Sequence, residues 1–242
     1  MSKFFIPFDV PISSFEVKHG DQLLFLGSCF SDEMSRKSVY YGFNVLSNPF
    51  GTIFHPEVIA RNLKDALNEN LNSERILKRN DFFFSWDASG TVFGYSEKEI
   101  IEKIKFQRTL LKNAIVESKV LFITFGTAWG YRLNETGLLV ANCHKVNGSS
   151  FSKELTEIDA LEYSWIQTIE LMQKVNPALK IVFTVSPVRH IKDGLVENNQ
   201  SKSILIELVR RLKAKQSASY FPSYEIMMDE LRDYRFYKKD LV

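Results

Sequence analysis

The chain has 242 residues, of which 45% are hydrophobic and 25% are charged, and its formal net charge at pH 7 is +2. This composition is typical of a globular protein with a sizeable core and excludes a disordered or fibrous chain. Because lysines and arginines are scattered among acidic residues, we expect neither nucleic acid nor a membrane surface as a partner.

No stretch of the sequence predicts a transmembrane helix, and Pro7, Asp9 and Pro11 interrupt the apolar N-terminus, so no signal peptide is predicted. The two cysteines, Cys29 and Cys143, do not predict a disulfide framework. We therefore expect a cytoplasmic protein with reduced thiols. The oligomeric state is left open.

Short apolar runs alternate along the chain with longer segments of helical periodicity. The runs that predict strands cover residues 22–28, 43–51, 120–126, 179–190 and the start of 218–231. The segments that predict helices cover residues 29–42, 55–70, 97–119, 153–175 and 198–215. An aromatic-rich hairpin is expected at 82–95, and a second hairpin around Asn134–Gly137.

This alternation predicts one α/β domain over residues 1–242, with a mostly parallel sheet that is covered on both faces. In such sheets, ligands bind beyond the carboxyl ends of the strands. The loops that begin at Ser28, 48–51, 126–129 and 186–190 are therefore the predicted location of a site.

Ser28 follows the first apolar run and precedes a predicted helix. A serine in this position is most often a helix cap. The same position offers backbone N–H donors and the positive end of the helix dipole, which would stabilise an oxyanion beside a nucleophilic serine. Position alone favours the cap and leaves the nucleophile open.

Several separate motifs carry a resemblance to a known family. They are GSCFSDEM, NPFGTIFHP, TFGTAWGYR, ANCHK and SPVRHIKDG. Together they resemble the GSCFA family, although Ser31 stands where the name-giving motif has alanine. That family is related to the SGNH, or GDSL-like, hydrolases. The resemblance implies a flavodoxin-like three-layer α-β-α sandwich and esterase activity on acylated carbohydrates or other small molecules.

Carried over to this chain, the resemblance makes Ser28 the nucleophile and its N–H part of the oxyanion hole. Gly51 falls where a second motif donates a backbone N–H, and Asn142 is the nearest substitute for an asparagine donor that the third motif lacks. Cys29 is expected to pack toward the helix or the core, because adjacent side chains point in different directions.

SGNH hydrolases carry an Asp-x-x-His motif near the chain end, whose histidine takes the serine proton. Asp240 matches the aspartate, but the sequence stops before the histidine. Either the chain is a fragment that ends just short of its base, or the resemblance fails there; we favour the fragment. His190 then becomes a candidate base or substrate contact, although a loop histidine is more often purely structural.

His144 and Trp129 are predicted to line the substrate site. The adjacent Cys143 and His144 lack the spacing of metal ligands, and no glycine-rich phosphate motif is present, so neither a metal nor a cofactor is predicted. The sequence therefore predicts a serine esterase acting on a small-molecule or carbohydrate ester. The alternative is a non-catalytic domain that binds a carbohydrate or an acylated ligand in the same cleft.

Overall fold

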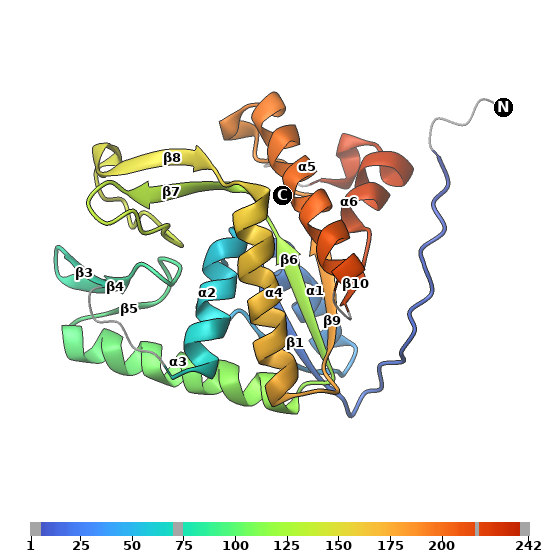
Figure 1. Ribbon diagram of the computed structural model, residues 1–242, viewed down its shortest axis with the longest axis horizontal. Coiled ribbons are helices and arrows are strands. Elements are labelled where there is room, and N and C mark those ends of the chain that lie inside the picture. The colour runs from blue at the N-terminus through green and yellow to red at the C-terminus, as the bar shows by residue number, and fades with distance from the viewer. Residues whose placement is uncertain (1–5, 70–74, 216–217, 238–242) are drawn as a thin grey trace.

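A computed structural model describes residues 6–69, 75–215 and 218–237. Its centre is a sheet of five parallel strands in the order β10-β9-β6-β1-β2 (Figure 1). These strands are β1 (Gln22–Gly27), β2 (Asn44–Ser47), β6 (Val120–Phe125), β9 (Lys180–Val185) and β10 (Ala218–Tyr220). Counting only these strands along the chain, the order is the flavodoxin-like one, with its switch point between β1 and β6.

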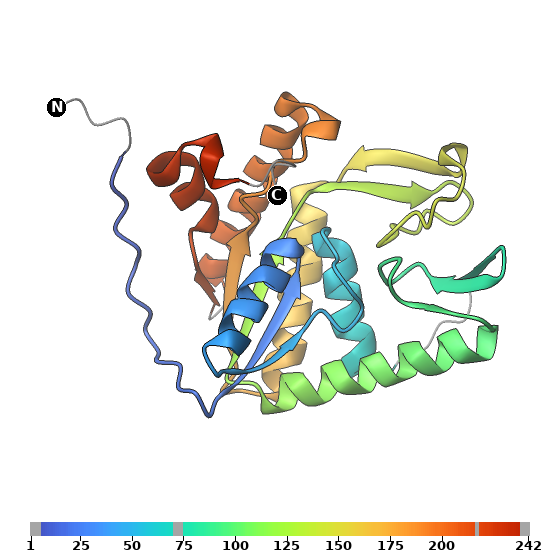
Figure 2. The same ribbon diagram turned by 180° about the vertical axis from the view of Figure 1, so that it is seen from behind.

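Helices cover both faces of this sheet, as Figures 1 and 2 show from opposite sides. On one face lie α2 (Pro56–Leu67), α4 (Ile158–Val175) and α5 (Leu195–Lys215), while α1 (Cys29–Tyr40) lies on the other. The long α3 (Glu97–Glu117) packs against α2. The predicted α/β sandwich with a flavodoxin-like sheet is confirmed.

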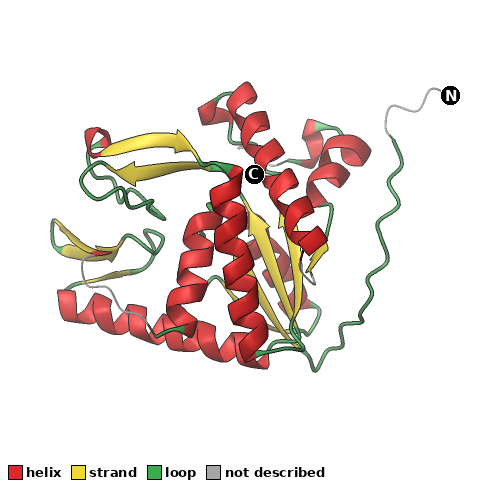
Figure 3. Ribbon diagram, viewed as in Figure 1, coloured by secondary structure: helices red, strands yellow, loops and turns green. Residues whose placement is uncertain are grey.

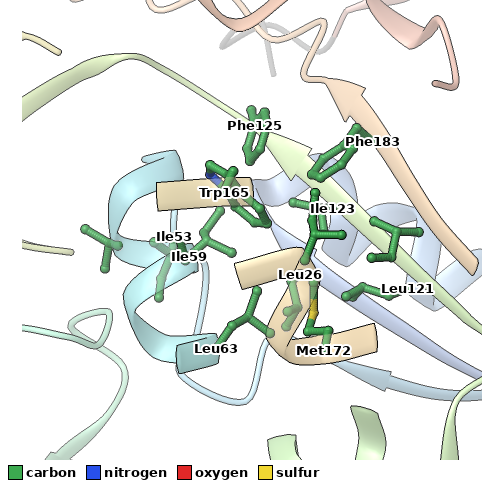
Figure 4. Packing of buried hydrophobic residues seen from close by; sticks show 14 of the residues in the cluster. Leu26, Ile53, Ile59, Leu63, Leu121, Ile123, Phe125, Trp165, Met172 and Phe183 are labelled. Atoms are coloured by element: carbon green, nitrogen blue, oxygen red, sulfur yellow. The ribbon is translucent and has the colours of Figure 1, made fainter. Parts of the chain in front are cut away.

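The main core lies between the sheet and the face formed by α2, α4 and α5. Figure 4 shows Trp165 of α4 at its centre, beside Phe125 of β6 and Phe183 of β9. The Trp165 ring centroid lies 5.1 Å from that of Phe125 and 5.3 Å from that of Phe183, both in edge-to-face geometry. A smaller cluster around Phe25 and Val182 covers the opposite face. Burial on both faces explains why these strands read as nearly continuous apolar runs.

Two antiparallel sheets lie to one side of the central sheet (Figure 3). The first contains β3 (Ile76–Arg79), β4 (Phe82–Ser85) and β5 (Phe93–Gly94), so the aromatic hairpin expected at 82–95 is confirmed, with one further strand beside it. The second pairs β7 (Trp129–Leu133) with β8 (Phe151–Leu155).

Around Asn134–Gly137 the chain does turn, because the Gly137 N–H donates to the Leu133 carbonyl at 2.7 Å. The segment after this turn, however, makes only an isolated bridge to β7, from Leu139 to Arg132. The strand that pairs with β7 along its length is β8, further along the chain. Residues 153–155, expected to be helical, therefore lie in a strand. Pairing with β7 outweighs their local helical preference.

After β10 the chain forms short helical segments. These are α6 (Ser223–Glu225), η4 (Ile226–Leu231) and η5 (Tyr234–Phe236); earlier loops contain the 3₁₀ turns η2 (Gly148–Ser150) and η3 (Ile191–Asp193). Within the described ranges, no helix combines the length and the hydrophobicity needed to cross a bilayer.

Candidate active site

A cavity of about 560 Å³ opens at the carboxyl end of the central sheet, near the switch point. Its walls come from the start of α1, residues 54–55, residues 127–131, residues 140–143, Lys153 and the loop 188–193. Four of these segments directly follow strands or begin helices, which is where parallel sheets bind ligands.

The chain turns sharply between β1 and α1 at Gly27, whose φ is +124°. A Cβ at this position would lie 2.1 Å from the carbonyl oxygen of Thr124 on the neighbouring strand β6. Only glycine permits both this φ and this close approach. The turn directs the next two residues, Ser28 and Cys29, into different surroundings.

Ser28 is the N-cap of α1 and is 1% exposed. Its Oγ accepts a hydrogen bond from the Phe30 N–H at 3.3 Å, and its own N–H donates to the Thr124 carbonyl at 3.1 Å. Neither its side chain nor its backbone lines the cavity. In this structure Ser28 therefore acts as a helix cap.

Cys29 is the first residue of α1, is half-buried, and lines the cavity. Burial and the nearby Asp32 carboxylate raise the pKa of its thiol, while the backbone N–H groups of Cys29 and Phe30 act in the opposite direction. The resting thiol is thus protonated at neutral pH. A nearby base is needed to make it a nucleophile.

The loop after β2 is held against the start of α1 by Asp32. One carboxylate oxygen accepts from Asn48 Nδ2 at 2.7 Å, and the other accepts from Thr52 Oγ1 at 2.8 Å. In this loop the Gly51 N–H donates to the Asn48 carbonyl at 2.7 Å. Gly51 borders a separate, much smaller cavity of about 20 Å³ rather than the large one.

His190 lies in the loop after β9 and lines the large cavity. Its ring packs edge-on against Phe54 with centroids 5.8 Å apart, and its Nε2 is buried without a hydrogen-bond partner among the described residues. Burial and the positive charge of Lys202 lower the pKa of His190 to about 4, against the opposing effects of Asp193 and the Gly126 carbonyl. The imidazole is therefore neutral at pH 7.

Lys202, on α5, is 1% exposed. Its Nζ donates to the carbonyl of Gly126 at 2.7 Å and to that of Ser186 at 2.8 Å, which lie just beyond the ends of β6 and β9. Burial lowers the pKa of Lys202 to about 7, against an opposing effect of Cys29.

Trp129, Asn142 and His55 also line the cavity. Trp129 is fixed by a hydrogen bond of 3.0 Å from its Nε1 to the Glu197 carbonyl, and the Lys153 ammonium lies 5.2 Å from its ring centroid. His55 caps α2 by accepting from the Glu57 N–H at 3.1 Å through Nδ1.

Comparison with known proteins identifies the family. The model of the GSCFA family matches residues 22–242. The chain belongs to the GSCFA family. A search of curated proteins found no significant match.

Among solved structures, the GSCFA chain resembles an acetyl xylan esterase, Est2A, from the rumen bacterium Butyrivibrio proteoclasticus. The TM-score is 0.40 at 11% sequence identity, and the match covers 86% of this chain. The chain spans 56% of the length of that esterase.

The structure brings together some of the residues predicted from the GSCFA motifs and separates others. Trp129, Asn142 and His190 line one cavity. His144 does not reach it: this side chain is 4% exposed, stacks on Phe84 with centroids 4.7 Å apart, and its Nε2 contacts the Ser85 carbonyl at 2.9 Å. Asp240 lies outside the described residues.

The expected orientations of Ser28 and Cys29 are reversed. We expected the serine to face the cleft and the cysteine to pack inside, whereas the serine is buried as a cap and the cysteine lines the cavity. The physical reason is that α1 begins at Cys29 itself, so the residue before it takes the capping geometry.

Sequence reasoning missed Lys202 altogether. A signal was present, because this lysine lies on the same stripe of α5 as Leu205, Leu208 and Leu212, all of which are buried. A lysine on an apolar helical stripe is uncommon and indicates a specific partner. Within the described part of the chain, no three His, Cys, Asp or Glu side chains gather as a metal site would require.

Proposed function

We propose that this GSCFA chain hydrolyses acyl esters by nucleophilic catalysis in the 560 Å³ cavity, with Cys29 as nucleophile and His190 as general base. One observation carries the proposal. A thiol at the N-terminus of a helix and a neutral histidine with a partnerless Nε2 line the same cavity at the carboxyl end of a parallel sheet. A nucleophile and a base in one cleft form the minimal machinery for acyl transfer.

In the proposed first step, His190 Nε2 takes the proton of the Cys29 thiol as Sγ attacks the ester carbonyl carbon. The tetrahedral intermediate then collapses, the carbon–oxygen bond to the alcohol breaks, and the protonated imidazole returns its proton to the leaving oxygen. In the second step, His190 removes a proton from a water molecule that attacks the thioester. The carboxylic acid leaves, and the proton returns to Sγ.

The oxyanion of both steps needs hydrogen-bond donors that are not already used. The start of α1 supplies one donor, the backbone N–H of Cys29, which interacts with the Cys29 sulfur. Asn142, which also lines the cavity, offers its side-chain amide; its Oδ1 accepts from the His144 N–H at 2.7 Å, which leaves Nδ2 as the end that donates. We assign these groups to the oxyanion in place of Gly51, whose N–H is engaged.

The walls of the cavity favour a substrate with a ring or an extended apolar face. Trp129, Tyr131 and Phe54 present aromatic surface, while Lys153 and Arg189 add polar groups. Mixed aromatic and polar walls suit a sugar or a comparable small alcohol carrying an acyl group. We therefore propose a small-molecule or carbohydrate ester as the substrate class, as in SGNH-type esterases.

Turnover of p-nitrophenyl acetate tests the assignment. Cys29→Ala and His190→Gln should each lose at least two orders of magnitude in kcat/KM, the usual weight of a nucleophile or a base. Cys29→Ser should retain measurable turnover, because a hydroxyl in the same place can use the same base. If Ser28→Ala abolishes turnover in a folded protein while Cys29→Ala does not, the nucleophile is the serine originally predicted.

One observation favours the second candidate, a binding domain without catalysis. The N–H groups of Ser28 and Gly51, both expected to bind an oxyanion, already donate to backbone carbonyls. A binding domain would retain an affinity for acylated sugars that Trp129→Ala weakens, and would show no turnover that depends on Cys29. Calorimetric titration beside the ester assay separates the two functions.

A further inference from the structure

We propose that Lys202 is a positioning residue for this reaction: its ammonium holds the loop that carries His190 and the neighbouring loop after β6 by donating to one carbonyl of each, and this places a positive charge close to the imidazole. This inference rests on the proposed function, in which His190 is the base. It assigns a role to a buried lysine that does not itself line the cavity.

The loop 186–190 is held at both ends by one helix. At its start, the Ser186 carbonyl accepts from Lys202 Nζ at 2.8 Å; at its end, the His190 N–H donates to Asn198 Oδ1 at 3.0 Å. Asn198 and Lys202 are four residues apart on α5 and so project from the same face, one turn apart. The loop thus has two fixed points, and the histidine is one of them.

The neighbouring loop after β6 is held by the same part of α5. Lys202 Nζ donates to the Gly126 carbonyl at 2.7 Å, and Ser201 Oγ accepts from the Ala128 N–H at 2.7 Å. The Gly126 carbonyl also acts on the His190 ring, whose pKa it raises. One carbonyl therefore links the ammonium of Lys202 to the imidazole of His190.

Burying the Lys202 ammonium in this arrangement is energetically unfavourable. Both partners of Nζ are neutral carbonyls, and burying an ammonium without a carboxylate is unfavourable. A glutamine or a serine would satisfy one carbonyl without that cost. The charge also lowers the pKa of His190, which a neutral donor would not do.

Other charged groups also face these two residues. Asp193, which is paired with Lys153, raises the pKa of His190, and Arg189 lowers that of Lys202. Cys29 raises the pKa of Lys202. Among the groups that act on the imidazole, Lys202 is the cation with the largest effect.

The test compares variants of two lysines on α5. Lys202→Gln removes the charge but keeps a donor, Lys202→Met removes both, and Lys213→Met removes an equal charge from an exposed site on the same helix. The His190 pKa is read by NMR of the ring carbons, assigned with His190→Gln. We expect it to rise by about one unit in both Lys202 variants and to stay unchanged in Lys213→Met. An unchanged His190 pKa in folded Lys202→Gln would overturn the proposal.

A second measurement needs no variant of Lys202. In the native chain, the His190 ring signals should show a small additional step near pH 7, because Lys202 titrates at about that pH. If the ring signals are flat from pH 6 to pH 9, the ammonium does not act on the imidazole and the proposal is wrong. Neither measurement uses an ester, so an inactive native enzyme would contradict the proposed hydrolysis and leave both results readable.

Discussion

Asn48 Oδ1 accepts a hydrogen bond of 2.7 Å from the Gly27 N–H, at the point where β1 ends and the chain turns toward Cys29. The same side chain donates through Nδ2 to Asp32 in the first turn of α1. One asparagine thus joins the end of the first strand, the loop after β2 and the start of the helix that carries the proposed nucleophile. Its φ of +40° is a conformation that asparagine tolerates better than most residues.

We predict that Asn48→Ala lowers the free energy of unfolding by about 2 kcal/mol, because it leaves the Gly27 N–H and the Asp32 carboxylate short of a partner. Asn48→Gly loses the same bonds but suits the positive φ, so it should be less destabilising than alanine. Urea unfolding of both variants measures the difference. Equal stability of Asn48→Ala and the native chain would contradict this account of the turn.

Gly27→Ala is predicted to be among the most damaging substitutions at the site. Its Cβ would lie 2.1 Å from a backbone oxygen that cannot move without displacing β6. Gly137→Ala is the matched control, because that glycine also has a positive φ, +69°, but no heavy atom within 4 Å of the added Cβ. We expect about 1 kcal/mol for the control, from backbone strain alone, and more than about 3 kcal/mol for Gly27→Ala. Similar losses for both would mean that the close approach to Thr124 is unimportant.

His55 makes the stability of the chain depend on pH. Burial lowers its pKa to about 4, so between pH 6.5 and pH 4 the unfolded chain takes up a proton that the folded chain refuses. Stability is therefore present above pH 6.5 and is lost as the pH falls toward 4, by about 3 kcal/mol for this shift. His190, with a pKa also lowered to about 4, adds to the loss in the same direction.

His55→Asn isolates this contribution, because asparagine keeps a capping acceptor for α2 and does not titrate. Chemical unfolding at pH 7 and at pH 4.5 should show a smaller difference for the variant than for the native chain. An unchanged difference would show that the buried imidazole is not responsible for the acid sensitivity.

Ser28→Ala tests the cap. Losing the bond from the Phe30 N–H should cost about 1 kcal/mol of stability, while esterase turnover keeps most of its native value. If Ser28→Ala is as stable as the native chain, the capping bond contributes nothing.

The sequence predicted the central sheet well because the signals there are local and strong. The run 120–126 corresponds to β6, because burial on two faces leaves a continuous apolar run. The amphipathic segment from Pro56 onward corresponds to α2, because burial of one stripe leaves a helical periodicity. The β7–β8 ladder was missed because its strands are about 20 residues apart along the chain, and pairing at that distance leaves no local pattern.

The candidate site was predicted only in part for a related reason. The alternation of strands and helices locates the loops, and His190, Asn142 and Trp129 do line one cavity. Which of two adjacent residues faces that cavity depends on the residue at which α1 begins, and helix ends are uncertain by a residue or two from sequence. Because α1 begins at Cys29, Ser28 caps the helix and Cys29 lines the cavity.

Trapping the acyl-enzyme tests the central claim most directly. The native chain and the Ser28→Ala and Cys29→Ala variants would be mixed briefly with p-nitrophenyl acetate, quenched in acid and digested for peptide mass spectrometry. We predict a single acetyl group on Cys29 in the native chain and in Ser28→Ala, and none on that peptide in Cys29→Ala. An acetyl group on Ser28, or native turnover with Cys29 replaced, would contradict the assignment of the thiol as the nucleophile.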